Sequence, residues 1–121
     1  MPRLQPQDPA AVAEAISRDE RTKADLRLLT KHFLAVLSEQ APGKSVEVRV
    51  PPYAAAQVVA GVRHTRGTPP AVIELDATTW IALATGETTW QQAVEAGRVR
   101  ASGERADLTP YLPLTGRDGP T

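Results

Sequence analysis

The spacing of the apolar residues changes at Pro42-Gly43, and this change constrains the fold more than any other feature. Residues 22–40 place apolar side chains at a helical period, whereas residues 45–50 alternate apolar and polar side chains. The helical stripe contains Leu26, Leu29, Phe33 and Val36 or Leu37. The alternation puts three valines on one face of a half-buried strand. The chain therefore has to pack an amphipathic helix against one face of a sheet.

Two further strands are predicted on either side of a short basic segment. Residues 53–62 are almost all small or β-branched, and residues 71–76 contain alternating apolar and acidic side chains. The segment RHTRGTPP, residues 63–70, joins them and has the glycine and prolines of a tight connection. These features predict an antiparallel hairpin. A last short strand is predicted over residues 99–102.

A local repeat separates the third strand from the last one. TTWIALATG begins at Thr78 and TTWQQAVEAG at Thr88, and each has a threonine near its start and a glycine at its end. The repeat predicts two short helices that place Trp80, Leu83, Trp90 and Val94 in a core. After the last strand, Asp107 is predicted to cap a helical turn within residues 108–114, which could act as a lid.

Together these elements predict a single α+β domain over residues 1–121. Asp8-Pro9 begins a first helix, and Thr22 with Asp25 has the spacing of a capping box for the long one. The sheet is expected to be twisted and mainly antiparallel, with four to five strands and the helices packed on one face. Residues 1–7 are predicted to form a loose arm and residues 115–121 a tail.

Composition excludes several classes of function. Fourteen basic and fourteen acidic residues give a formal net charge of zero, so the whole molecule has no attraction to nucleic acid. The chain has no cysteine, which excludes disulfides and thiolate metal sites. No apolar run approaches the ~20 residues of a transmembrane helix, and no signal peptide is recognisable at the N-terminus. We therefore expect a cytoplasmic protein.

The sequence contains no recognisable catalytic or metal-binding motif. His32 lies within the long helix and His64 in the basic segment, and neither has further ligands at metal-site spacing. His32 is expected to face solvent or a helix cap. Nucleophile-elbow, dinucleotide-binding and phosphate-loop motifs are all absent. The sequence predicts neither an enzyme nor a cofactor.

The basic segment and the arginines of the sheet each have two interpretations. Gly67 and Pro69-Pro70 suit a rigid turn, and His64 and Arg66 at its tip could hold an anionic head group. The arginines could likewise form a basic face, or they could pair across strands with the interleaved glutamates. These residues are Arg49, Arg63, Arg66, Arg98, Arg100 and Arg105, with Glu47, Glu74, Glu95 and Glu104.

From Val46 onward the chain resembles the sterol carrier protein superfamily, and specifically its small bacterial orthologue domain, which occurs mainly in actinobacteria. The resemblance rests on VEVRVPPYAAAQ, RHTRGTPPAVIELDATTWIALATG and TWQQAVEAGRVRASGERADLTPYLP. In the superfamily an acidic residue ends a strand, an aromatic residue follows on a short helix, and a glycine leads into a strand with spaced valine and glycine. The matching residues here are Asp76, Trp80, Gly97, Val99 and Gly103.

The resemblance implies an antiparallel sheet covered by helices, with an apolar tunnel that binds sterols, fatty acids or acyl-CoA. It does not imply isomerase activity, because the chain lacks the metal-binding helical bundle of the related isomerase-like enzymes. The side chains suited to line a tunnel, with ordinary core packing as the alternative, are Val58, Val59, Ile73, Trp80, Leu83, Trp90, Val94 and Leu112. Two hypotheses follow: a non-enzymatic carrier of a lipid-like molecule, or an accessory module that docks on a partner protein through its sheet edge or arginine-rich face.

Overall fold

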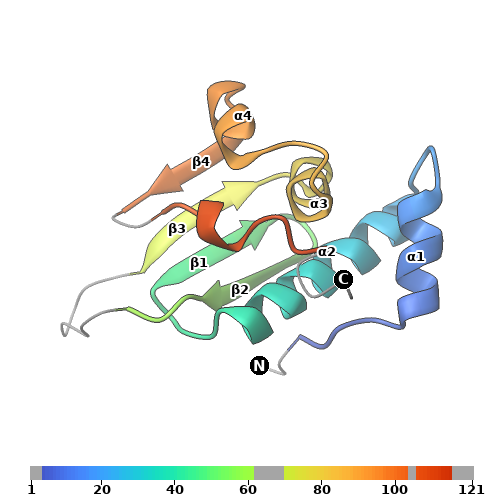
Figure 1. The fold of residues 1–121 in the computed structure, drawn as a ribbon, viewed down its shortest axis with the longest axis horizontal. Coiled ribbons are helices and arrows are strands. Elements are labelled where there is room, and N and C mark those ends of the chain that lie inside the picture. The colour runs from blue at the N-terminus through green and yellow to red at the C-terminus, as the bar shows by residue number, and fades with distance from the viewer. Residues whose placement is uncertain (1–3, 62–69, 104–105, 116–121) are drawn as a thin grey trace.

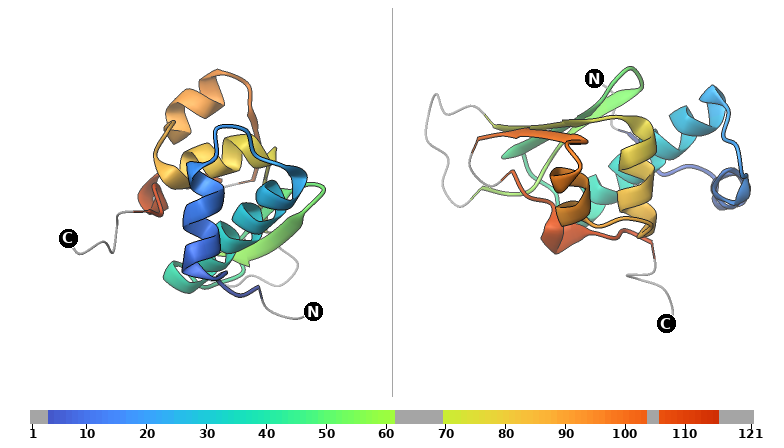
Figure 2. Two further views of the ribbon diagram at one scale, coloured as in Figure 1. Left: turned by 90° about the vertical axis from the view of Figure 1, so that its right-hand side faces the viewer. Right: turned by 90° about the horizontal axis from the view of Figure 1, so that it is seen from above.

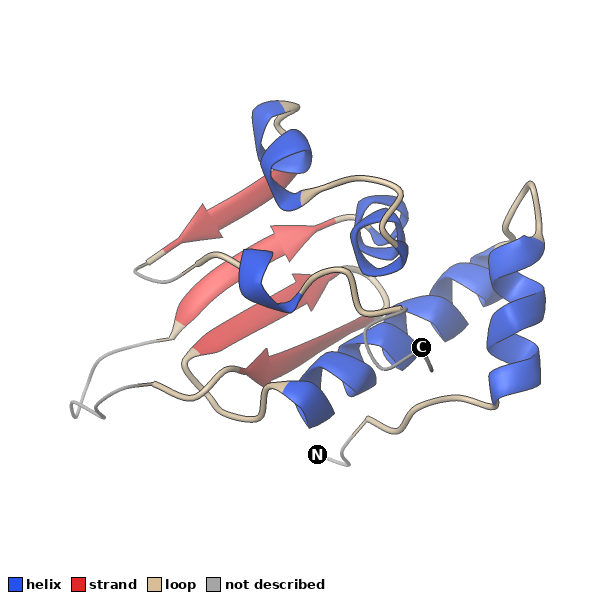
Figure 3. Ribbon diagram, in the orientation of Figure 1, coloured by secondary structure: helices blue, strands red, loops and turns tan. Residues whose placement is uncertain are grey.

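The computed structural model describes residues 4–61, 70–103 and 106–115. Within these ranges it contains four α-helices, four strands and one short 3₁₀ helix, coloured by type in Figure 3. The elements, labelled in Figure 1, are α1 (Pro9–Ser17), α2 (Lys23–Gln40), β1 (Val46–Val50), β2 (Ala54–Val58), β3 (Ala71–Leu75), α3 (Ala77–Thr85), α4 (Trp90–Glu95), β4 (Val99–Ser102) and η1 (Thr109–Tyr111).

The four strands form one mixed sheet in the order β2-β1-β3-β4. β1 pairs antiparallel with β2 and parallel with β3, and β3 pairs antiparallel with β4. Seen from above in Figure 2, the helices and the C-terminal segment lie on one side of this sheet. The predicted α+β fold with helices on one face is therefore confirmed.

The predicted hairpin between residues 53–62 and 71–76 is wrong. β2 and β3 are not neighbours, because β1 lies between them. The burial of the strands explains this order. β1 and β3 bury every second side chain against the helices, so both take central positions, whereas the alanine-rich β2 is only partly buried and lies at an edge. β2 is also shorter than predicted, since Val59 leaves the strand with a φ of 67°.

The local capping signals of α1, α2 and α4 were predicted correctly. The Thr22 hydroxyl accepts a hydrogen bond from Asp25 N at 3.1 Å, and the Asp25 carboxylate accepts one from Thr22 N at 2.9 Å. These bonds, led by the Thr22 amide and joined by Arg18, hold the pKa of Asp25 below its usual value although burial opposes the shift. Asp8 and Thr89 cap α1 and α4 in the predicted way.

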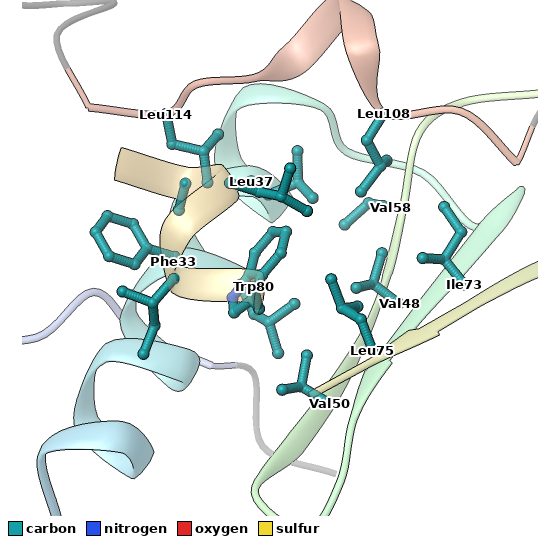
Figure 4. Close-up of a cluster of buried hydrophobic side chains, with 14 of the residues drawn as sticks. Phe33, Leu37, Val48, Val50, Val58, Ile73, Leu75, Trp80, Leu108 and Leu114 are labelled. Atoms are coloured by element: carbon teal, nitrogen blue, oxygen red, sulfur yellow. The ribbon is translucent and has the colours of Figure 1, made fainter. Parts of the chain in front are cut away.

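The core lies between the sheet and the helices and is apolar. Figure 4 shows Trp80 at its centre, with Phe33 and Leu37 from α2 and valines from β1 around it. Trp80 has no exposed surface. The predicted core position of Val94 is wrong, since its exposed fraction is 45%. The six-residue α4 buries only Ala93, so Val94 has no layer to pack against.

His32 is half-buried rather than solvent-facing. Its Nδ1 accepts a hydrogen bond from Gln7 N at 3.0 Å, and its ring makes an edge contact with Phe33. The bond joins the segment before α1 to the middle of α2. Only a neutral imidazole can accept at this nitrogen.

Acidification is expected to destabilise the domain through His32. Burial lowers the pKa of His32 below 6.5, although Glu39 partly opposes the shift. The unfolded chain therefore binds the proton more readily, so the free energy of unfolding falls as the pH decreases from about 6.5 toward the lower pKa of the folded state. Denaturant titrations between pH 7.5 and 5.5 measure this slope. His32→Gln should flatten it and His64→Gln should not; equal slopes in the two variants would contradict the assignment.

Candidate functional site

The side chains predicted to line a tunnel fall into three groups. Val58, Ile73, Trp80 and Leu83 are fully buried between the sheet and the helices, with exposed fractions of 1% or less. Val59, Trp90 and Leu112 are half-buried and pack at the margin of the core. Val94 lies on the surface. The first group thus comes together in one place, and Figure 4 shows Val58, Ile73 and Trp80 within the same cluster.

The two layers are in direct contact at the fully buried group. A side chain that lined a lipid-sized space would have surface that a water-sized sphere can touch, and these four have almost none. A permanently empty pocket of about 300 Å³ would cost on the order of 7 kcal/mol. The whole stability of such a domain is about 5–15 kcal/mol. At these four side chains, space for a ligand would therefore require a part of the protein to move aside.

The C-terminal segment is the part best placed to move. Residues 106–115, which we call the strap, cross the helical side of the molecule as loops around one short helical turn (Figures 1 and 3). Leu108 and Leu114 reach from the strap toward the cluster around Trp80 (Figure 4) and are buried. The strap thus covers this part of the core with the side chains of Leu108 and Leu114, and its residues 106–115 contain no strand and no long helix.

The strap forms hydrogen bonds both within itself and to α3. Tyr111 N donates to Leu108 O at 2.9 Å, and Thr109 N donates to the Asp107 carboxylate at 2.9 Å. The predicted cap position of Asp107 is wrong, because Leu108 is the N-cap of η1 and the helical turn begins one residue later than expected. Three bonds to α3 converge on a single acceptor, Ala84 O: the amides of Leu114 and Thr115 donate at 2.9 and 3.1 Å, and the Thr115 hydroxyl donates at 3.4 Å. The bonds given between the strap and α3 thus share one acceptor, and the buried Leu108 and Leu114 add apolar contacts to the core.

The opposite face of the sheet is polar. Arg49 donates to Glu47 at 3.2 Å, and Glu74 lies in register between Arg49 and Arg100. The hydrogen bond and the charge of Glu47 raise the pKa of Arg49 further. Acidic and basic side chains therefore alternate on this face, and its one ion pair within the described residues, Arg49 with Glu47, lies along β1 and not across strands, so the cross-strand pairs stay a prediction.

A shallow groove of about 390 Å³ lies at one end of this polar face, away from the core. Its lining consists of Arg49, Pro51, Pro52, Tyr53, Ala54, Ala55 and Glu74. The sequence analysis did not assign it a role. Its sequence signal is Pro51-Pro52 directly after β1, since two prolines that cannot donate to a strand ladder end the pairing there.

Two other predictions concern anion and metal binding. His64 and Arg66 lie outside the described residues, so their role at a head group stays a prediction. Among residues 4–61, 70–103 and 106–115, no group of three or more histidine, aspartate or glutamate side chains is placed to hold a metal ion. No helix in these ranges has the length and apolarity needed to cross a bilayer.

The motif residues at the end of β3 have a structural role. Asp76 caps α3, because its carboxylate accepts from Thr79 N at 3.1 Å and from the Thr79 hydroxyl at 2.6 Å. Burial would raise the pKa of Asp76, but these hydrogen bonds outweigh it and the pKa is lowered. The cap fixes the start of the helix that carries Trp80 into the core.

Removal of this cap is expected to weaken the domain by about 1–2 kcal/mol. In Asp76→Ala both bonds from Thr79 are lost, whereas Asp76→Asn keeps a side-chain oxygen that can accept one of them. Chemical denaturation at pH 7 should therefore rank wild type first, Asp76→Asn second and Asp76→Ala last. Asp107→Ala, which removes the single hydrogen bond that the exposed Asp107 carboxylate accepts from Thr109 N, is the comparison. An effect of Asp76→Ala no larger than that of Asp107→Ala would contradict the role of Asp76.

These features define a class of protein: a single sheet with helices on one face and an apolar interface between the layers under a C-terminal strap. A family model described as the bacterial SCP (sterol carrier protein) ortholog matches residues 21–114. The chain belongs to this family. Members are generally non-catalytic carriers, so membership indicates a lipid-binding or carrier role in general terms. No curated protein matches the chain.

Proposed function

We propose that this domain is a non-enzymatic carrier that binds one apolar chain, such as a fatty acyl group or a sterol-like molecule, between the sheet and the helices. The strap gives way to admit the ligand. The observation that carries the proposal is the pair of buried leucines, Leu108 and Leu114, which cover the apolar cluster from a segment joined to α3 through one acceptor, Ala84 O.

The free energy needed to withdraw the strap is of the same order as the free energy gained when a ligand chain is buried in its place. Exposure of a buried leucine costs about 1.5–3 kcal/mol, so withdrawal of Leu108 and Leu114 costs roughly 3–6 kcal/mol. A bound chain gains about 0.8 kcal/mol for each buried methylene. A dozen methylenes thus contribute about 10 kcal/mol before the cost of ordering the ligand. The gain exceeds the cost of opening, and the strap closes again when the ligand leaves.

The fully buried group is the proposed contact surface for the chain. Val58 and Ile73 come from the sheet, whereas Trp80 and Leu83 come from α3. Withdrawal of the strap leaves these apolar side chains as the walls of the new space. The half-buried Leu112 belongs to the strap itself and is proposed to contact the ligand at the entrance.

Native mass spectrometry and a titration with hexadecanoic acid test the proposal. Gently purified protein should carry a fatty acid or another apolar molecule, and delipidated protein should take up one equivalent of hexadecanoic acid with saturation. Octanoic acid is the matched control, since its shorter chain buries fewer methylenes and should bind at least tenfold more weakly. An absence of saturable uptake of either acid would overturn the carrier function.

A further inference from the structure

We propose a second binding surface, for a protein partner, at the edge of the sheet formed by β4. The partner contributes an extended acidic segment that adds to β4 as a fifth strand. The surface consists of β4, the preceding Arg98, and Trp90 and Val94 of α4; we call it the β4 edge. It is distinct from the proposed ligand space and does not depend on it.

Within residues 4–61, 70–103 and 106–115, the backbone of β4 has one side without a partner strand. In the sheet order β4 is the last strand, and its register shows pairing with β3 alone, from Val99 with Leu75 to Ser102 with Val72. Figure 1 shows β4 at the rim of the sheet. An edge strand presents alternate amide and carbonyl groups outward, and an extended segment can pair with them.

The helical layer covers β4 only in part. Val99 and Ala101 pair with Leu75 and Ile73, which are buried beneath the helices. On β4 itself, however, Val99 is only half-buried and Ala101 is exposed. Val94, the only large hydrophobic side chain that is exposed among the described residues, belongs to α4, which packs against β4. Exposed apolar side chains thus lie both on β4 and on the helix that packs against it.

The charges at this edge favour an acidic partner. Arg98 and Arg100 are exposed, and within the described residues neither guanidinium group has a hydrogen bond or a carboxylate within salt-bridge distance. Glu74 lies opposite Arg100 in register but does not form a salt bridge with it. By contrast, Arg49 on the same face is paired with Glu47. Two unpaired guanidinium groups therefore flank the free edge.

Strand geometry sets the pattern that the partner needs. Arg100 lies on the opposite face of β4 from Val99 and Ala101, because side chains alternate along a strand. The complementary segment alternates acidic side chains, opposite Arg100, with apolar side chains that extend the surface of Val94 and Val99. The arginines disfavour pairing with a second copy of β4, because like charges would come together across the new ladder.

Amide NMR spectra of the ¹⁵N-labelled protein test this proposal with a capped six-residue peptide in which glutamate alternates with valine. The expected result is saturable shifts at the amides of Val99–Ser102 that weaken as salt is added. The matched control is the peptide with lysine in place of glutamate, which should give no such shifts. Arg100→Glu should weaken the acidic peptide about tenfold, whereas Arg49→Glu should leave its binding unchanged.

Three results would overturn the proposal: no shifts at β4 with millimolar acidic peptide, equal shifts with the lysine peptide, or equal losses in the two arginine variants. Sedimentation at increasing protein concentration tests whether a second copy of this chain binds the β4 edge instead. Self-association that Arg100→Glu alters would identify a second copy on this edge and contradict the acidic partner. These peptide and sedimentation results do not depend on whether the protein binds hexadecanoic acid, so the two proposals can fail separately.

Discussion

Replacement of Gly43 by alanine is expected to lower the free energy of unfolding by about 3 kcal/mol or more. An added Cβ would lie 2.2 Å from both the carbonyl carbon and the carbonyl oxygen of Val59 and 2.3 Å from Ala60 N. These are backbone atoms, so no flexible side chain can move aside. Gly43 also has a φ of 152°, which an L residue rarely adopts. Urea denaturation at pH 7 measures the loss.

Gly97→Ala separates the clash at Gly43 from backbone strain alone. Gly97 has a φ of 73°, but an added Cβ there would have no atom within 4 Å. Its replacement should therefore cost only the strain, about 1–2 kcal/mol. Similar losses for Gly43→Ala and Gly97→Ala would show that the loop after α2 does not pack against the end of β2 as described.

Leu108→Ala is expected to change stability and ligand binding in opposite directions. Leu108 is fully buried, so its truncation should cost about 2–5 kcal/mol. The same change removes a side chain that competes with the ligand for the apolar cluster and leaves space that methylenes can fill. Binding of hexadecanoic acid should therefore tighten by roughly tenfold. Denaturation and titration of the same preparation give both quantities.

Leu29→Ala is the control for this pair of effects. Leu29 is equally buried, but it belongs to α2 rather than to the strap. Its truncation should destabilise the domain to a similar degree without any gain in affinity. An equal gain in affinity from the two variants would mean that ligand binding follows general loosening of the core and not the opening of the strap.

The helices and strands were predictable because their signals are local. The cap residues Thr22, Asp25 and Asp76 act within three positions of themselves, and the alternating valines of β1 need only one buried face. The order of the strands was not predictable in this way. The predicted hairpin between β2 and β3 agreed with every local sequence signal. It was wrong because the sheet order depends on which strands have the larger apolar faces. These are β1 and β3, and both lie at the centre of the sheet.

The sequence predicted which residues come together at the candidate site, but not whether they enclose a space or pack directly against one another. Val58, Ile73, Trp80 and Leu83 come together as apolar residues from the sheet and α3. Periodicity cannot show whether such residues enclose a space or touch, since both arrangements bury the same side chains. Val94 was misplaced because a helical period says which residues share a face and not whether another layer covers that face. The groove beside Pro51-Pro52 and the β4 edge depend on the sheet order and needed the fold.

Hydrogen exchange at the amides of Leu114 and Thr115 tests the role of the strap most directly. Both amides bond to Ala84 O when the strap is closed. The account predicts that saturating hexadecanoic acid accelerates their exchange, while the amides of β1 stay protected. Saturable uptake of the acid with unchanged exchange at these two amides would contradict entry under the strap, and no uptake at all would contradict the carrier function.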